Sequence, residues 1–220
     1  MPSITDCVAN VLDLVRIGSD GGENMNQRQS MFRIVLLSVM SVLLLLGLTG
    51  CPKAFKGGEA NLPPDIELGG KYYTQYSFQY EKNRHRTTNY RKGFLVPVNT
   101  PVELISWGRK GFMIRILPNG PEVEIENVQK HTGDTIGKAF HKMLARQKLN
   151  LNQFTPSERK LILEGKVAPG MSKKAVIAAI GYPPITQTPT LDMDEWRYWA
   201  SRFDTFIVRF KNGKVKEIVN

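Results

Sequence analysis

A run of thirteen mostly apolar residues, 34–46, follows Arg28 and Arg33 and leads through small residues to Cys51. A basic stretch, an apolar core of about 7–15 residues and a small-residue cleavage site together make up a secretory signal. A membrane-spanning helix needs about 20 apolar residues, so this run is short for one. We therefore expect residues 1–50 to be removed and the fold to be built from residues 51–220. An uncleaved signal anchor is the alternative.

The residues at the expected cleavage site form a second pattern, Leu48, Thr49, Gly50 and Cys51. This tetrapeptide resembles the lipobox of bacterial lipoproteins, in which the cysteine is diacylated and becomes the first residue of the mature chain. A thiolate is nucleophilic near neutral pH, and two or three acyl chains hold a protein stably on a bilayer. The resemblance implies a covalent lipid on Cys51, and we expect no other cofactor. Asp after the cysteine retains such proteins in the inner membrane, so Pro52 implies the periplasm-facing leaflet of the outer membrane.

Residues 1–24 precede the basic stretch and fit a signal poorly. A signal starts a few residues before its basic region, so we expect Met25 or Met31 to be the true start. Residues 1–24 are therefore left out of the fold prediction.

Without residues 1–50 the chain has 170 residues, with 27 Lys and Arg against 16 Asp and Glu, a net charge of +11. That length allows two small domains. Only Cys51 remains of the two cysteines, so the core must rest on apolar packing without a disulfide. A basic exported chain favours anionic headgroups, acidic envelope polymers or an acidic protein as partners, and we expect no nucleic acid. A charged surface without a specific partner explains the charge equally well.

Composition and periodicity divide the mature chain into a flexible tether over 51–70, a small β module over 71–130, a connecting helix over 131–152 and a C-terminal domain over 153–220. The tether is rich in Gly, Pro and Lys and has no periodicity. In the β module, the residue patterns and turn signals predict strands at 72–80, 94–98, 102–107, 112–117 and 123–126. We expect a small antiparallel barrel, SH3-like, or a meander. Apolar residues at helical spacing predict a helix over 134–147.

The C-terminal domain is predicted as two short helices followed by three antiparallel strands. Thr155 and Glu158 form a capping box, and Ser172 can cap the second helix, which ends at Gly181. Strands are expected at 196–200, 205–210 and 215–219, the last two joined by a type I′ turn at 212–213. The predicted class is therefore α+β: a small β module, then helices and an ααβββ two-layer domain.

This C-terminal domain also carries a family signature. A Gly-Met-Ser turn between apolar positions is followed by a Trp-x-Tyr strand and a Phe…Gly-x-Val ending; the matching residues are Val167, Gly170, Met171, Ser172, Val176, Ile180, Gly181, Pro183, Trp196, Tyr198, Phe210, Gly213 and Val215. Over 153–220 the chain resembles the SmpA/OmlA (BamE-like) domain of small lipoproteins in the outer-membrane β-barrel assembly machinery. The resemblance implies docking to an envelope protein such as that machinery, with Gly170, Met171 and Ser172 as contact candidates. Members of that family lack the preceding β module.

The residues that commonly carry chemistry do not form a catalytic pattern. His85, His131 and His141 lack the spacing of metal ligands, and we expect all three at the surface. Ser172 is followed by Lys173, but its place at a helix start makes it a cap rather than a nucleophile with a base. A solvated loop explains an acidic cluster better than a Ca²⁺ site or a hydrolase does; the cluster is Asp192, Asp194 and Glu195. We expect no enzyme, no catalytic residue and no metal site.

Basic residues gather at the predicted turns of the β module, interleaved with aromatic ones. The basic residues are Arg84, Arg86, Arg91, Lys92, Arg109 and Lys110, with Lys82 nearby. Turn tips on one rim could form a cationic, aromatic-edged patch for a glycan, an anionic headgroup or a protein. Turns are also where solvated charge collects. In the C-terminal domain, Trp196 and Tyr198 are expected under the helices and Trp199 on the exposed face.

Two functions are compatible with these patterns. The first is a periplasm-facing lipoprotein that acts by binding, as an accessory or scaffold in outer-membrane protein assembly or envelope integrity. The alternative is a binding module whose basic β module holds peptidoglycan or anionic lipid. Electrostatic capture weakens as ionic strength rises, whereas apolar docking persists, so salt distinguishes the two.

Overall fold

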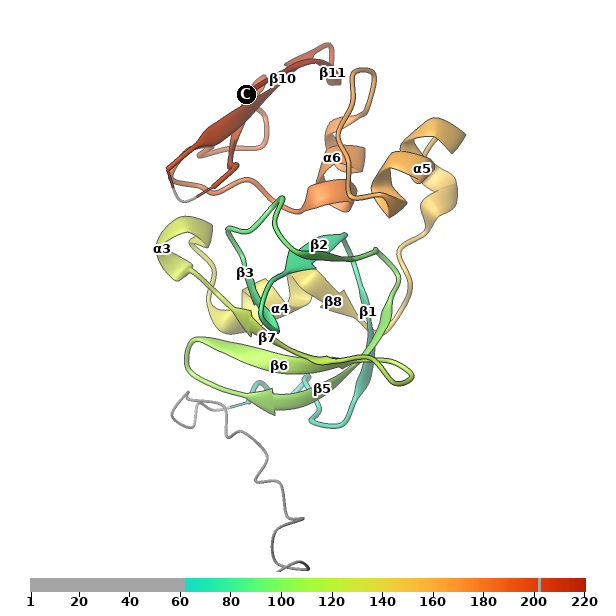
Figure 1. Cartoon of the computed structure of the whole chain (residues 1–220), viewed down its shortest axis with the longest axis vertical. Coiled ribbons are helices and arrows are strands. Elements are labelled where there is room, and N and C mark those ends of the chain that lie inside the picture. Colours follow the sequence, from blue (N-terminus) through green and yellow to red (C-terminus); the bar gives the residue numbers. More distant parts are fainter. Residues whose placement is uncertain (1–61, 202) are drawn as a thin grey trace, which may run out of the picture. The chain divides into compact units, whose positions relative to one another are not determined.

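The computed structural model describes residues 62–201 and 203–220, which belong to one compact unit of the chain, Phe55–Asn220 (Figure 1). Three sheets and several short helices make up these residues, so the predicted α+β class is confirmed. The apolar run, the lipobox and Cys51 lie outside the described residues. Among the helices that the structure describes, none is both long and apolar enough to span a membrane.

Residues 62–145, called here the β part, are mainly β structure. The strands are β1 (Lys71–Thr74), β2 (Phe78–Tyr80), β3 (Arg84–Arg86), β4 (Phe94–Val96), β5 (Pro101–Trp107), β6 (Gly111–Ile116), β7 (Glu122–Glu126) and β8 (Leu144–Ala145). Six strands form one sheet in the order β3-β7-β6-β5-β1-β8, with β3 and β8 at its edges, and β2 pairs with β4. Strands β5, β6 and β7 form the predicted meander, but β3 runs parallel to β7, so the sheet is mixed rather than purely antiparallel.

The single strand predicted over 72–80 is wrong. The chain leaves the sheet after β1 because remote groups bind its backbone: the Gln75 N–H donates to the Met143 carbonyl, and the Ser77 N–H donates to the Ala178 carbonyl. The Tyr76 ring packs so closely on Gly181 that a Cβ there would lie 3.0 Å from the ring. The alternating pattern was correct locally, but tertiary contacts divide it into β1 and β2.

The helix predicted over 134–147 is shorter, and the segment 131–152 is not a connecting helix. Short helix α3 (Gln129–Thr132) precedes α4 (Ile136–Met143), whose cap at Leu144 is already extended. The chain then forms β8, where Leu144 pairs with Thr74 of β1. Phe140, Met143 and Leu144 are buried in the core of the β part. The segment therefore completes this core instead of linking two modules.

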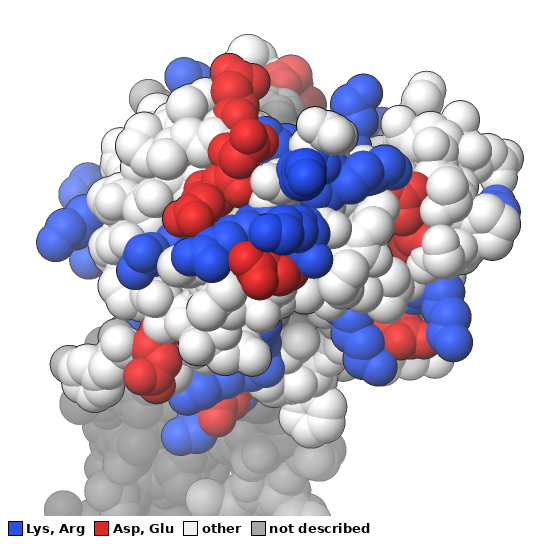
Figure 2. Space-filling model, turned by 90° about the horizontal axis from the view of Figure 1, so that it is seen from above, with Lys and Arg blue, Asp and Glu red and all other residues white. Residues whose placement is uncertain are grey.

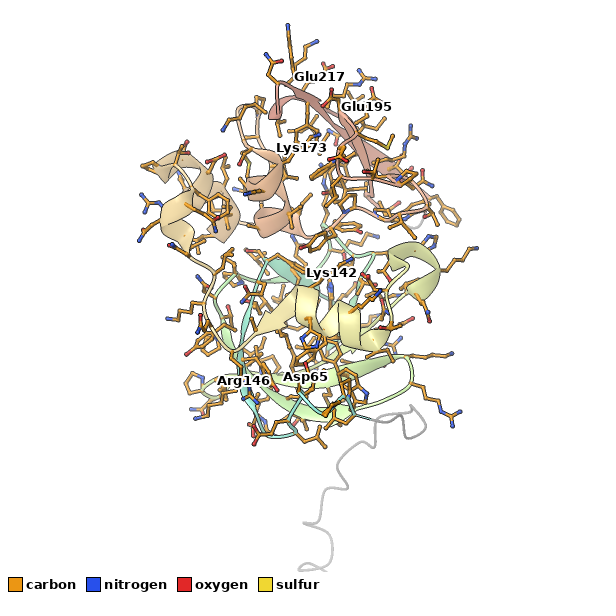
Figure 3. The ribbon with its side chains drawn as sticks, turned by 180° about the vertical axis from the view of Figure 1, so that it is seen from behind. Asp65, Lys142, Arg146, Lys173, Glu195 and Glu217 are labelled. Carbon is orange, nitrogen blue, oxygen red and sulfur yellow. The ribbon has the colours of Figure 1, made fainter. Side chains whose placement is uncertain are left out.

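The second half of the predicted tether is folded against the β part. Ile66 is buried in the same core, and the Gly69 N–H donates to the Leu104 carbonyl. Two side-chain contacts hold the segment: His141 Nε2 lies 2.9 Å from the Asp65 carboxylate, and Arg146 forms an ion pair with Glu67 at 2.8 Å. Figure 3 shows Asp65 and Arg146 beside α4 and the chain that follows it. Only residues 51–61 therefore remain as a candidate tether, and they lie outside the described residues.

Residues 149–220, called here the C-terminal part, have the predicted ααβββ order. After a short 3-10 helix, η1 (Leu151–Gln153), come α5 (Pro156–Leu163), α6 (Lys173–Ile180), β9 (Glu195–Trp199), β10 (Thr205–Lys211) and β11 (Lys214–Val219). The capping box of Thr155 and Glu158 is confirmed, as is the Ser172 cap of α6. Asn212 and Gly213 have φ of 53° and 72°, which the predicted type I′ hairpin requires.

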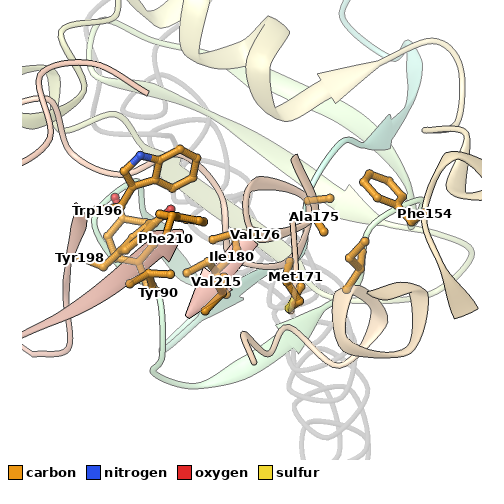
Figure 4. Packing of buried hydrophobic residues seen from close by; sticks show 14 of the residues in the cluster. Tyr90, Phe154, Met171, Ala175, Val176, Ile180, Trp196, Tyr198, Phe210 and Val215 are labelled. Atoms are coloured by element: carbon orange, nitrogen blue, oxygen red, sulfur yellow. The ribbon is translucent and has the colours of Figure 1, made fainter. Parts of the chain in front are cut away.

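The core of the C-terminal part includes residues from the β part. Trp196, Tyr198 and Phe210 lie beneath α6 together with Met171 (Figure 4). Tyr90, from the loop between β3 and β4, packs edge to face on Tyr198, with ring centroids 4.9 Å apart. Val98 belongs to the same cluster. The two parts therefore share apolar side chains and stabilise each other.

Ser77 gives a direct test of this coupling. Its hydroxyl donates to the Ile162 carbonyl at 2.7 Å and accepts from the Val98 N–H at 2.9 Å, and the residue is buried. We expect Ser77→Ala to lower the free energy of unfolding by about 1–3 kcal/mol, because both backbone groups lose a buried partner. Urea denaturation of residues 52–220 measures this, with the exposed Ser157→Ala as control. If Ser77→Ala lowered the free energy of unfolding no more than Ser157→Ala does, this prediction would be contradicted.

Candidate functional site

A cleft of about 610 Å³ lies where the β part meets the C-terminal part. Its lining comes from five places in the fold: the turn from β2 to β3, β3, the loop from β3 to β4, the segment of α3, and the end of β9. Residues brought together from such distant segments make a concave site of the size that small ligands occupy. Three of the six residues predicted as a basic patch line it, Arg84, Arg86 and Lys92.

Arg84 and Arg86 lie on strand β3 and not at a turn, which corrects the prediction. The strand pairs with β7, and Arg84 and Arg86 stand opposite Glu124 and Glu126. Arg84 Nε lies 3.1 Å from Glu124, and Arg86 Nε lies 3.4 Å from Glu126. More than half of each arginine side chain is exposed, 53% and 55%. Nη1 of Arg84 also lies 3.8 Å from Glu126, whereas the ion pair of Arg86 uses Nε.

His85 is buried between these two arginines, so the prediction of three surface histidines is wrong for it. The residue is 3% exposed, and Nδ1 lies 2.7 Å from the Gln79 carbonyl. Burial lowers the pKa of His85 to about 4, although the hydrogen bond to Gln79 favours the protonated form. The neutral ring therefore donates from Nδ1 to Gln79. Because neighbouring strand residues alternate, an inward His85 directs both arginines outward.

The loop from β3 to β4 is rigidly held and brings Lys92 to the cleft. The Asn89 side chain donates to the carbonyls of Gln79 and Lys92 and accepts from the Lys92 N–H. Tyr90 donates its hydroxyl to the Tyr182 carbonyl at 2.9 Å. Lys92 is exposed and has no ion pair within the described part of the chain. Its ammonium is therefore available to a ligand.

The cleft lining also includes an indole side chain, that of Trp199. Trp199 is partly buried rather than exposed as predicted, and its ring meets His131 edge to face, with centroids 5.8 Å apart. His131 is itself fixed, because Nδ1 lies 2.9 Å from the Thr186 hydroxyl. Trp199 Nε1 has no hydrogen-bond partner among the described residues. The cleft therefore includes an aromatic ring held in place by His131 in addition to the arginines.

The other predicted basic residues have different surroundings. The Arg91 guanidinium carbon lies 3.5 Å from the centre of the Phe206 ring, and Nη1 donates to Asn220. Arg91 therefore fastens its loop to the C-terminal part. Arg109 and Lys110 occupy the turn between β5 and β6, outside the cleft lining. The six residues do not form one patch.

The predicted contact turn is largely used by the fold. The Met171 side chain is 1% exposed, and the Ser172 hydroxyl caps α6 by accepting from the Ala175 N–H. Gly170 is exposed, with φ of +90° and open space at its Cβ position. Met171 therefore acts as a core residue, and a partner at this turn would meet Gly170 and Ser172. The role of the turn in partner binding stays a prediction.

Two of the three residues of the acidic cluster, Asp194 and Glu195, are paired with basic side chains. Asp194 lies 3.5 Å from Lys173, and Glu195 lies 2.8 Å from Arg209, which also reaches Glu217 at 3.2 Å. Seen from above, acidic and basic side chains lie side by side on this face (Figure 2). No three His, Cys, Asp or Glu side chains of the described residues are grouped so that they could hold a metal ion.

Prediction from the sequence missed several residues that line the cleft. These residues are Glu81, Thr88, His131 and Ser201. No local pattern marks them, because they meet only when the two parts pack together. Comparison with protein-family models, with curated proteins and with solved structures yields no match to this chain.

Proposed function

We propose that this chain is a lipid-anchored protein of the bacterial cell envelope that acts by binding and holds an anionic envelope component in the basic cleft. The observation that carries the proposal is that Arg84, Arg86 and Lys92 line one cleft together with Trp199. Arginine is the side chain best suited to carboxylate and phosphate groups, because its planar fork can bond two oxygens at once. An aromatic wall adds apolar contact.

The shape of the cleft favours a discrete ligand over a bilayer surface. Arg84 and Trp199 line the same concave site of about 610 Å³, and a flat membrane would not fill such a site. Lipid on Cys51 would supply the membrane attachment, as the lipobox resemblance implies. Residues 51–61 span at most about 40 Å when extended. The ligand would then be a component that lies near the membrane, such as peptidoglycan.

A charge-removal variant tests this function. We expect the combined change Arg84→Gln, Arg86→Gln and Lys92→Gln to reduce retention of envelope glycan by the full-length lipoprotein about tenfold or more, because three cations leave the cleft. The matched control removes three exposed cations outside the cleft lining, with Lys110→Gln, Lys211→Gln and Lys216→Gln. Co-purification from detergent-solubilised envelopes at low and high salt, followed by muropeptide and lipid analysis, measures retention. If both variants lost retention equally, the effect would be a nonspecific effect of charge, and the assignment of binding to the cleft would be contradicted.

The anchor is tested in the same preparations. Cys51→Ala should move the protein from the membrane fraction to the soluble fraction and abolish labelling with a fatty-acid probe. Continued labelling of that variant would contradict lipidation of Cys51. Because the cleft variants retain Cys51, anchoring and ligand capture are measured separately.

A second candidate is an accessory role in outer-membrane protein assembly. It is favoured by the ααβββ order and by the outer face of β9, β10 and β11, where Arg197 and Val219 are exposed on either side of Ile207. Such a partner should co-purify at both low and high salt. Recovery of β-barrel assembly subunits in the cleft variant as in the unaltered protein would favour this second function.

A further inference from the structure

The cleft lining is mixed in charge rather than uniformly basic. Glu81 lines it together with the three cations, and Glu124 and Glu126 stand behind Arg84 and Arg86. A densely charged ligand such as a polyphosphate would meet these carboxylates as well as the cations. A ligand with one anionic group and many neutral hydroxyls suits such a lining better, because carboxylates accept hydrogen bonds from hydroxyls.

The neutral groups of the cleft point to the same chemistry. Thr88 contributes a hydroxyl for which the described residues supply no hydrogen-bond partner. Asn89 is different, because its amide is already occupied by Gln79 and Lys92. Among the described residues, the Thr88 hydroxyl and the Glu81 carboxylate have no side-chain partner. Together with the N–H donors of the cations, they can bond to the hydroxyl groups of a ligand.

The Trp199 wall supplies an apolar contact of fixed orientation. His131 contacts the ring edge to face and is held by Thr186, so the ring does not need to be ordered when a ligand binds. Pyranose rings have an apolar face of C–H groups, which packs on aromatic rings. A free phosphate has no such apolar face and would not pack on the Trp199 ring.

We propose, building on the proposed function, that the cleft recognises an acidic saccharide. Its carboxylate is held by Arg86 and Lys92, its ring lies on Trp199, and its hydroxyls bond to Glu81 and Thr88. The volume of about 610 Å³ is within the range for ligands of this size. Arg86 is the principal arginine, because its ion pair uses Nε and leaves both terminal nitrogens to the carboxylate.

A matched pair of sugars tests the role of the carboxylate. The disaccharide of N-acetylglucosamine and N-acetylmuramic acid carries a lactyl carboxylate, whereas N,N′-diacetylchitobiose, called chitobiose below, has the same N-acetylated pyranose rings without it. We expect the acidic disaccharide to bind the full-length lipoprotein in detergent micelles about tenfold more tightly than chitobiose in calorimetric titrations. Equal affinity for the two sugars would overturn the proposal, and so would binding of neither.

Variants of the two walls test the placement. Trp199→Ala should lower the affinity for the acidic disaccharide about tenfold. Trp199→Phe should retain most of this affinity, because an aromatic ring remains. Arg86→Gln should reduce the preference for the acidic sugar over chitobiose, and Lys110→Gln, outside the cleft, should leave it unchanged. Undiminished affinity in Trp199→Ala, or an undiminished preference in Arg86→Gln, would overturn the assignment.

Competing ligands separate this inference from the proposed function. Inorganic phosphate and phosphatidylglycerol vesicles should displace the acidic disaccharide only weakly. If phosphate or the vesicles displaced the disaccharide strongly, and the charge-removal variant no longer bound them, the assignment of a saccharide ligand would be overturned. The cleft would still be an anion-binding site. Envelope retention that does not depend on Arg84, Arg86 and Lys92 would instead overturn the proposed function itself.

Discussion

Tyr90→Ala is expected to lower the free energy of unfolding by about 3–5 kcal/mol, the usual cost of removing a large buried aromatic ring. Tyr90 is 6% exposed and lies in the core of the C-terminal part, although it comes from a loop of the β part. Its ring packs on Tyr198, and its hydroxyl bonds to the Tyr182 carbonyl. The substitution would leave a cavity and an unpaired carbonyl at the junction. Urea denaturation of residues 52–220 measures the change.

Tyr90→Phe is the matched control for this prediction. It keeps the ring and removes only the hydrogen bond to Tyr182, so we expect a loss of about 1 kcal/mol. Tyr90 also lines the cleft, and the alanine variant should therefore lose affinity for the acidic disaccharide even where it remains folded. A Tyr90→Ala protein as stable as the phenylalanine variant would show that the ring contributes little to the junction.

Features that depend on neighbours in the sequence were predictable. The capping box joins residues three positions apart, and the hairpin turn at Asn212 and Gly213 depends on two adjacent residues that tolerate positive φ. The alternation of Val123 and Ile125 with glutamates also has a local cause, the two-residue period of a strand. Such signals do not depend on which remote segment packs against them.

Features that depend on remote partners were not predictable. The break after β1 depends on backbone hydrogen bonds from Gln75 to Met143 and from Ser77 to Ala178, residues that lie far away in the sequence. Strand β3 contains Arg84, His85 and Arg86, an entirely polar sequence that is typical of a loop. It becomes a strand because β7 offers a free edge with glutamates in register. A pattern of apolar residues cannot indicate this kind of pairing.

The candidate site was predictable only in part, for the same reason. Basic character near Arg84, Arg86 and Lys92 was evident, but their separation from Arg109 follows from the sheet order. The aromatic wall was not predicted, because Trp199 reaches the cleft only when β9 packs beside α3. Ion pairs to glutamates further show that a count of basic residues overstates the charge of the site.

The second large effect is expected at Glu158, which connects the starts of both helices in the C-terminal part. Its carboxylate accepts from the Ser172 N–H at 2.8 Å and from the Thr155 N–H at 3.0 Å, and Lys214 lies 3.5 Å away. The residue is 5% exposed. Glu158→Gln keeps one acceptor oxygen but removes the charge and one strong acceptor, so we expect a loss of about 3 kcal/mol at pH 7.

The pH dependence identifies the cause of that loss. Burial raises the pKa of the Glu158 carboxyl, but hydrogen bonds from Ser172 and Thr155 outweigh it and lower the pKa from 4.5 to about 2. Because the folded state has the lower pKa, the unfolded state binds the proton more tightly. The stabilisation is therefore fully present above about pH 5 and is lost as pH falls towards 2.

The free energies of unfolding of Glu158→Gln and of the unaltered protein should consequently become more similar as the pH falls. Urea denaturation of residues 52–220 between pH 7 and pH 2.5 should show a stability difference that is largest near neutral pH and shrinks steadily below pH 5. Glu164→Gln is the control, because that glutamate lies beyond the last turn of α5 and its ion pair among the described residues is with Lys166 on the surface. A difference between Glu158→Gln and the unaltered protein that stays constant with pH would show that shape, and not the ionised carboxylate, causes the loss.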